Sequence, residues 1–211
     1  MTMKRSTRLK RHLRQFLAVS ALALLGQAHG AANPPDAEVR AATEEVLAVI
    51  ASAPDARTLR QLAEEKVVPR FDFRRMTQLA AGRVWNQASP AQQDELTREF
   101  QHLLVRTYTK ALAATRHAQA KVTVMPARIR EGSNEATVKT TVAEPGRQAI
   151  AIDYRMEQAD GAWKVVDVTV DSISLVTNYR DWFASQAQSG GVDGVIRALA
   201  EKNRGSAQVA G

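Results

Sequence analysis

The stretch QAIAIDYRMEQADGAWKVVDVTVDSISLVTNYRDWFAS, residues 148–185, decides the fold. Apolar side chains alternate with polar or small ones in residues 148–158, the period of a strand with one buried face. The apolar set is Ile150, Ile152, Tyr154 and Met156. Residues 163–171 are rich in β-branched side chains and carry apolar residues on both faces, which predicts a second strand. A hairpin around Asp160 therefore leads directly into a helix with the sequence SLVTNYRDWF.

The turn at residues 159–161 predicts the register of this hairpin. If it is a three-residue loop with Gly161 in the left-handed conformation, the apolar faces of the two strands coincide. The expected pairs are Tyr154 with Val166, Ile152 with Val168, and Ile150 with Val170. A two-residue loop would place Tyr154 opposite Asp167, and a slip by one residue is costly when one face is buried. The favoured register also sets Asp153 opposite Asp167.

Residues 1–32 are typical of a cleavable secretory signal. Six basic residues precede an apolar run at residues 16–25, and small residues follow it. Cleavage is expected after Gly30 or Ala32. The apolar run is too short to span a bilayer, so we expect a soluble, exported mature protein. The chain has no Cys, which excludes a disulfide framework and suits a bacterial periplasm.

The excess of basic over acidic residues comes largely from this leader. It holds 6 of the 29 Lys and Arg residues and none of the 22 acidic ones, which leaves 23 against 22 in residues 33–211. The composition therefore gives no reason to expect nucleic-acid binding. Residues 66–130 carry 12 basic and 4 acidic residues, so this segment and Arg180 are candidates for contact with an anionic headgroup or an acidic partner.

Helices are expected before the sheet, over residues 36–51, 55–67, 72–82 and 90–115. Asp72 is a predicted N-cap, Gly82 a stop signal, and Ser89 opens a capping box with Gln92. Strands are expected over residues 121–125, 127–130 and 135–143, before the hairpin. After the SLVTNYRDWF helix, Gly190 and the glycine that follows precede a short last helix over residues 193–201, with a frayed tail from residue 203.

This order predicts an α+β fold, with helices packed on one face of a curved antiparallel sheet. Residues 33–203 would form a single domain and residues 204–211 a flexible tail. Such a cone-shaped, NTF2-like arrangement encloses an apolar cavity between sheet and helices.

Few residues indicate chemistry. His102 lies beside basic residues on the polar side of the long helix, and His117 follows the end of that helix. Two His residues without Cys or clustered acids do not predict a metal site. Ser172 and Ser174 sit in no nucleophile-elbow sequence, and the chain has no glycine-rich phosphate loop. No cofactor is expected.

Two long blocks nevertheless resemble one family. They are residues 72–112, from DFRRM to TKAL, and residues 153–183, DYRMEQADGAWKVVDVTVDSISLVTNYRDWF. Together with the leader, they are similar in order and spacing to the MlaC family of periplasmic phospholipid-binding proteins, also called toluene-tolerance proteins. One departure is Ser172, where the family pattern usually has Gly.

The resemblance implies a carrier rather than an enzyme. Its cargo would be a glycerophospholipid, held with the acyl chains inside the cavity and the headgroup outside. The implied partners are an outer-membrane lipoprotein–porin complex and an inner-membrane ABC transporter with an MCE-domain protein, and the carrier itself would be a monomer.

Combined with the apolar faces, the resemblance gives a set of expected lipid-contacting residues on the helices, the sheet and the closing helix. They are Met76, Leu79, Phe100, Leu103, Leu104, Tyr108, Val138, Val142, Ile150, Ile152, Tyr154, Val166, Val168, Ile173, Leu175, Val176 and Tyr179.

Two other classes of protein remain open at this point. One is a small exported enzyme of the isomerase or dehydratase type, with Asp153 or Asp167 acting beside Tyr154. That hypothesis needs an acid pointing into the cavity. The other is an envelope adaptor without a cavity, whose apolar stripes fill one another.

Overall fold

The computed structural model describes residues 33–52, 55–114 and 120–208 of the 211-residue chain. The predicted leader and His117 lie outside these ranges. Residues 33–211 form one compact unit. Within the described ranges no helix combines the length and the apolar character needed to cross a membrane.

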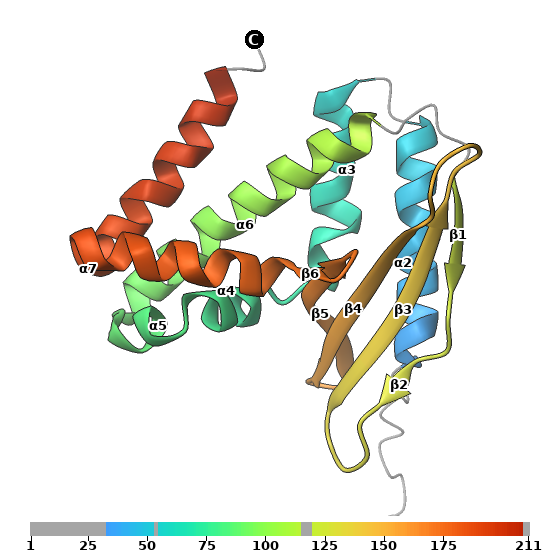
Figure 1. The fold of residues 1–211 in the computed structure, drawn as a ribbon, viewed down its shortest axis with the longest axis horizontal. Helices are drawn as coiled ribbons and strands as arrows, with labels where there is room; N and C mark the ends of the chain where they lie inside the picture. Colours follow the sequence, from blue (N-terminus) through green and yellow to red (C-terminus); the bar gives the residue numbers. More distant parts are fainter. Residues whose placement is uncertain (1–32, 53–54, 115–119, 209–211) are drawn as a thin grey trace, which may run out of the picture. The chain divides into compact units, whose positions relative to one another are not determined.

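Helices come first, then an antiparallel sheet, then a long kinked helix (Figure 1). The elements in chain order are α2 (Pro35–Ser52), α3 (Ala56–Lys66), the 3-10 helix η1 (Val68–Arg70), α4 (Phe73–Ala81), α5 (Arg83–Gln87), α6 (Pro90–Ala114), β1 (Lys121–Val124), β2 (Arg128–Ile129), β3 (Glu135–Ala143), β4 (Ile150–Ala159), β5 (Ala162–Val170), β6 (Ile173–Ser174) and α7 (Leu175–Gln208).

The predicted caps begin and end the helices where expected. Asp72 accepts a hydrogen bond from the backbone N–H of Arg75 at 2.8 Å and so caps α4, which ends at Gly82 with φ 55°. At the start of α6, Ser89 Oγ accepts from the N–H of Gln92 at 3.3 Å. The Gln92 side chain accepts from the N–H of Ser89 at 2.9 Å, which completes the capping box.

The sheet has six strands in the order β1-β3-β4-β5-β6, with β2 also paired to β3, and every pairing is antiparallel. The predicted α+β class with a curved antiparallel sheet is confirmed. In Figure 1, α2 runs alongside the sheet, whereas α4, α5 and most of α7 lie to its left.

The predicted register of the β4–β5 hairpin is wrong. The turn has two residues, Asp160 and Gly161, whose φ values of 51° and 76° suit a tight hairpin turn. The strands then carry a β-bulge, because Arg155 pairs with Asp167 while Met156 pairs with Val165.

Val166 is the extra residue of this bulge. Beyond it the pairs are Tyr154 with Val168 and Ile152 with Val170, so apolar residues still face each other. Asp153 lies opposite Thr169 and not opposite Asp167. The bulge restores the match of the faces that we expected a three-residue loop to provide.

A short strand separates β5 from α7, where the sequence predicted a direct passage into the helix. Asp171 and Ser172 form a second tight turn with φ values of 45° and 72°, and β6 pairs back onto β5. Ser172 therefore holds a left-handed conformation that favours glycine.

α7 is longer than predicted. It kinks at Gly190 and Gly191, the second with φ 59°, where the sequence predicted a break, but it continues to Gln208 and not to residue 201. The Asn203 side-chain amide donates to the Glu99 carbonyl at 3.0 Å and to its carboxylate at 2.8 Å, and Arg106 donates to the Asn203 carbonyl. These bonds hold the last turns of α7 against α6.

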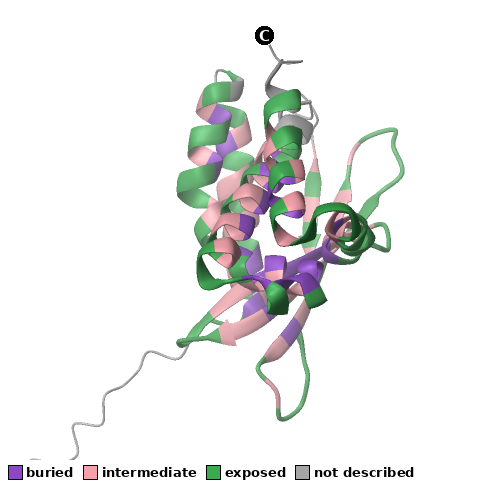
Figure 2. Ribbon diagram, turned by 90° about the vertical axis from the view of Figure 1, so that its left-hand side faces the viewer, coloured by how far each residue is buried: buried purple, intermediate pink, exposed green. Residues whose placement is uncertain are grey.

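Buried apolar residues form separate clusters, seen as purple segments on the inner sides of the elements in Figure 2. The helical cluster joins α4, α5, α6 and α7 around Phe100 and Phe183, both 0% exposed. The sheet cluster joins Val138, Met156, Val165 and Val168 with Val39 of α2. The helical cluster fixes the scaffold, and the sheet cluster borders the site described next.

Candidate functional site

An apolar cavity of about 530 Å³ lies between the sheet and the helices α2, α3 and α6. Among the described lining residues the charged ones are Glu38, Arg70 and Glu144. The apolar and aromatic lining residues are Val39, Ala42, Val46, Leu47, Val49, Ile50, Leu59, Ala63, Val67, Val68, Phe71, Phe73, Met76, Leu104, Val105, Tyr108, Ala120, Val122, Val142, Ile150, Ile152, Tyr154, Met156, Trp163, Val165, Val168, Val170 and Leu175.

The sheet wall follows from strand alternation and from the bulge. The alternating apolar residues of β4 all line the cavity, because side chains two residues apart lie on the same face of a strand. They are Ile150, Ile152, Tyr154 and Met156. On β5, Trp163 and Val165 line it before the bulge, and Val168 and Val170 line it afterwards. The step of three residues across Val166 keeps the β5 side chains on one wall.

The helical wall comes from the apolar stripes of α2 and α3 and from the C-terminal half of α6. Val39, Val46 and Ile50 lie on one apolar stripe of α2, and all three line the cavity. In α6, Leu104 and Tyr108 line it, whereas Phe100 faces the helical cluster. One continuous apolar stripe of α6 thus packs in the helical cluster through Phe100 and lines the cavity through Leu104 and Tyr108.

Three large apolar residues of the lining are also exposed to solvent. Leu47 is 37% exposed, Tyr108 37% and Ile150 39%, and they come from α2, α6 and β4. We call these three residues, which line the cavity and are also reached by solvent, the mouth. An exposed apolar rim continuous with an apolar interior is typical of a binding site for an apolar ligand.

Two tyrosine hydroxyls add polar groups to the lining. Burial raises the pKa of Tyr154, an effect partly offset by a hydrogen bond with the Thr140 hydroxyl. The Thr140 Oγ1 in turn donates to the carbonyl of Ile152 at 2.9 Å. Burial also raises the pKa of Tyr108, and the nearby Tyr179 raises it further. Both phenols therefore stay neutral around pH 7 and offer hydrogen bonds without charge.

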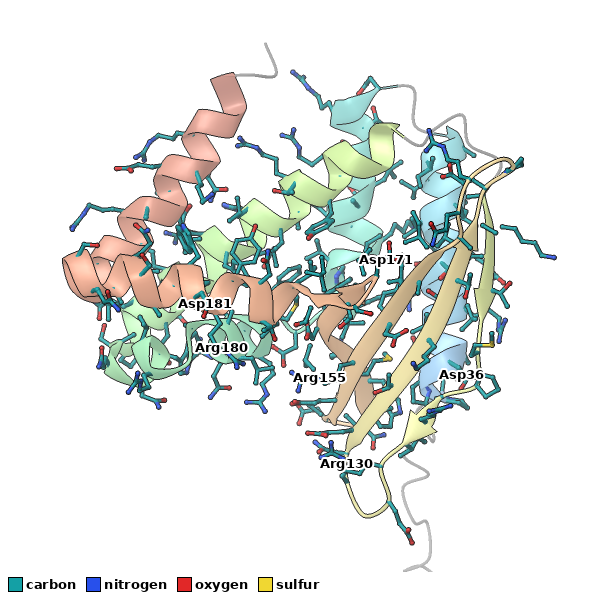
Figure 3. The ribbon with its side chains drawn as sticks, viewed as in Figure 1. Asp36, Arg130, Arg155, Asp171, Arg180 and Asp181 are labelled. Carbon is teal, nitrogen blue, oxygen red and sulfur yellow. The ribbon has the colours of Figure 1, made fainter. Side chains whose placement is uncertain are left out.

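The two acids of the enzyme hypothesis lie outside the cavity lining. Asp153 is paired with Lys139 at 3.3 Å. Asp167 accepts from the hydroxyl of Ser174 at 2.6 Å and from the backbone N–H of Val176 at 3.1 Å. Figure 3 shows Arg155, the cross-strand neighbour of Asp167, on the side of the sheet turned away from α2. The acid pair is thus neither juxtaposed nor directed at Tyr154.

Nine of the expected lipid-contacting residues line the cavity together. They are Met76, Leu104, Tyr108, Val142, Ile150, Ile152, Tyr154, Val168 and Leu175.

The other eight expected residues lie elsewhere. Val138 is buried in the sheet cluster, Val166 is the bulge residue, and Ile173 is 62% exposed on β6. The remaining five belong to the helical cluster or pack against it, because α4, α6 and α7 bury those faces against one another. They are Leu79, Phe100, Leu103, Val176 and Tyr179.

Sequence reasoning missed most of the wall formed by α2 and α3. It also missed the aromatic lining residues Phe71 and Trp163. The periodicity of α2 and α3 was visible, but it does not tell a helix that lines a cavity from one that packs on a solid core. Phe71 and Trp163 gave no signal, because Phe71 follows a 3-10 helix and Trp163 was expected on the face opposite Val168.

The residues described contain no group of three or more His, Asp or Glu side chains that could hold a metal ion. His102 is exposed on α6.

Comparison with known proteins gives a family match and similar proteins. Residues 40–201 match the family model described as MlaC protein. The toluene tolerance protein ttg2D of Pseudomonas putida is 30% identical over 106 residues, which cover 50% of this chain and 48% of that protein. This match therefore spans about half the length of the curated relative.

A solved structure is similar over most of the chain. It is the phospholipid-binding protein from Ralstonia solanacearum in complex with a phospholipid, with a TM-score of 0.74 and 37% sequence identity. The match covers 83% of this chain and 98% of that one.

Proposed function

This chain belongs to the MlaC family, and from that membership and its cavity we propose that it is a periplasmic phospholipid carrier. The observation that carries the proposal is the lining: an enclosed wall of aliphatic and aromatic side chains with a mouth of exposed apolar residues. The similar Ralstonia solanacearum protein was solved with a phospholipid bound, which supports the same class of cargo here.

The energetics of acyl chains explain why such a lining suits a carrier. Each buried CH₂ group gains about 0.8 kcal/mol, so two acyl chains represent more than ~20 kcal/mol relative to water. A cavity that competes with a bilayer must therefore be almost wholly apolar. Its charged lining residues are accordingly few: Glu38 on α2, Arg70 on η1 and Glu144 just after β3.

The expected pose places the chains between β4, β5 and the helices, with the headgroup at the mouth. In this pose the nine predicted residues that line the cavity contact acyl chains, together with the α2 stripe. The hydroxyl of Tyr108, a partly exposed mouth residue, would hydrogen-bond the ester or phosphate region.

We propose further that the protein carries glycerophospholipid between the outer and inner membranes, within a pathway that maintains lipid asymmetry. The leader pattern in residues 1–32 supports export. The partners would be an outer-membrane lipoprotein–porin complex and an inner-membrane ABC transporter with an MCE-domain protein. Because both membranes bury acyl chains equally well, net transfer would depend on partners that change the shape of the cavity.

Native mass spectrometry of the mature protein purified from a periplasmic extract, followed by organic extraction, tests the carrier function. We expect a bound mass of ~700 that extracts as phospholipid. Each CH₂ group of its acyl chains should contribute about 0.8 kcal/mol to the free energy of binding. A protein that is empty and also takes up no lipid from vesicles would contradict the proposal.

A further inference from the structure

The helix α2 (Pro35–Ser52), which forms one wall of the cavity, has few buried residues for its 18-residue length. Its buried residues are Pro35, Val39 and Val49. Val39 belongs to the sheet cluster, and Val49 to a separate small cluster with Leu59 of α3. The helical cluster contains no α2 residue among those described. A long helix with so few buried anchors can separate from its neighbours at a lower cost than a helix of the helical cluster.

The segment facing α2 is, in contrast, fixed to the sheet. The backbone N–H of Asp72 donates to the carbonyl of Val165 at 2.9 Å, and Phe71 forms a β-bridge with the same residue. Lys164 Nζ donates to the carbonyl of Pro69 at 2.7 Å. The 3-10 helix η1 is thereby attached to β5 and forms a rigid base.

Arg70, the last residue of η1, joins this base to α2. Its Nη1 lies 3.0 Å from Glu38 Oε2, and its Nη2 lies 2.8 Å from Glu45 Oε2. Glu38 and Glu45 are seven residues apart, so both carboxylates lie on one face of α2, two turns from each other. Arg70 and Glu38 also line the cavity. These are the ion pairs that α2 makes within the described part of the chain.

The side chains of these three residues are partly exposed to solvent. Arg70 is 26% exposed, Glu38 28% and Glu45 41%. Ion pairs at such a half-exposed position are of modest strength and are weakened by salt. Their location suits a contact that forms and breaks during function better than one that stabilises the fold.

We propose that Arg70, Glu38 and Glu45 form a latch that holds α2 against η1 and so retains the cargo in the cavity. The inference rests on the proposed carrier function and adds a release mechanism to it. When the two ion pairs break, α2 can move away from η1 and open the cavity along its side, so that the acyl chains leave without passing lengthwise through the mouth. Arg70 is a positioning residue here, because it acts through α2.

The test is the release of a fluorescent phosphatidylethanolamine from loaded protein to acceptor vesicles at several NaCl concentrations. Arg70→Met keeps the apolar stem and removes both ion pairs. The double variant Glu38→Gln and Glu45→Gln removes the same pairs from the α2 side and serves if Arg70→Met does not fold. The matched control is Arg130→Met, which removes a 2.8 Å ion pair with Glu135 at the β2–β3 hairpin (Figure 3).

We expect both latch variants to release lipid about three- to tenfold faster at low salt, the range that two half-exposed ion pairs allow. Wild-type release should accelerate with NaCl and approach the variants near ~1 M, where the Debye length is about 3 Å. Hydrogen exchange on lipid-free protein should show α2 amides less protected in the latch variants by a similar factor. The Arg130→Met variant should behave as the wild type in every measurement.

Equal release by wild type and latch variants at all salt concentrations would overturn the latch. So would an equal acceleration in Arg130→Met. A wild type that retains no lipid would instead contradict the carrier function. In that case, hydrogen exchange on lipid-free protein still decides whether Arg70 holds α2, and unchanged protection in Arg70→Met would refute that as well.

Discussion

Ile152 and Val138 allow the cavity to be separated from the solid core within one sheet. Ile152 lines the cavity on β4, whereas Val138 on β3 is 0% exposed and does not. We expect Ile152→Glu to abolish lipid retention with little loss of stability in the empty protein, because water in the cavity can solvate the carboxylate. We expect Val138→Ala to have the opposite effect, lower stability with retention preserved.

The magnitudes follow from protonation and packing. With lipid bound, the carboxylate at position 152 must be desolvated or protonated. Protonating a carboxyl of ordinary pKa about 4.3 at pH 7 costs about 3.7 kcal/mol, a loss of roughly 500-fold in affinity. At pH 5 the same cost falls to about 1 kcal/mol, so retention should largely return on acidification. Val138→Ala should cost about 2 kcal/mol, or roughly 4–8 °C in Tm.

The assay is lipid retention by native mass spectrometry at about pH 7 and pH 5, beside thermal unfolding of delipidated protein. Ile152→Gln is the matched control, because Gln is a neutral side chain of the same size as Glu. Its loss of lipid affinity should be smaller and should not depend on pH. The reasoning is refuted if Ile152→Glu keeps its lipid at pH 7. It is also refuted if that variant lowers Tm as much as Val138→Ala does, since Ile152 would then be ordinary core.

Three further predictions concern the scaffold. Asp167→Asn should cost about 1–3 kcal/mol in urea unfolding, because Asp167 bonds the start of α7, whereas Asp153→Asn should cost under about 1 kcal/mol; equal costs would contradict this. Ser172→Gly should stabilise the protein by roughly 0.5–1 kcal/mol by relieving the φ of 72°, and a lowered Tm would argue against it. Burial raises the pKa of Tyr154 above the ordinary 10.0, so the folded state binds more protons there and the unfolding free energy should fall as pH rises past that value. Tyr154→Phe should make this fall shallower, and an unchanged pH profile would count against the burial of the phenol.

Most of the fold could be predicted from the sequence where the signal is local. Caps decide where α4 and α6 begin, and each cap needs only three or four consecutive residues, as Asp72 and Ser89 show. The strand β3 spans the predicted residues 135–143, because its alternation has one buried face. The family resemblance was carried by longer motifs and is confirmed by the match over residues 40–201.

The other features of the fold and the site depend on tertiary contacts, which the spacing of apolar residues in the sequence does not reveal. The apolar stripe of α6 is continuous, yet Phe100 faces α7 while Leu104 and Tyr108 face the cavity. The spacing of apolar residues along a helix gives the direction of their stripe but not what lies against it. The far end of α7 was likewise set by distant partners, because Asn203 bonds to Glu99 of α6. Most of the cavity lining was missed for this reason, chiefly the walls from α2 and α3.

The β5 bulge links the cavity to the scaffold. Without an extra residue at Val166, strict alternation would turn Val168 and Val170 away from the wall that holds Trp163 and Val165. With it, both pairs line the cavity. The carboxylate of Asp167 is then directed at Ser174 and at the N–H of Val176, at the start of α7. One inserted residue therefore sets both a cavity wall and the entry of the closing helix α7.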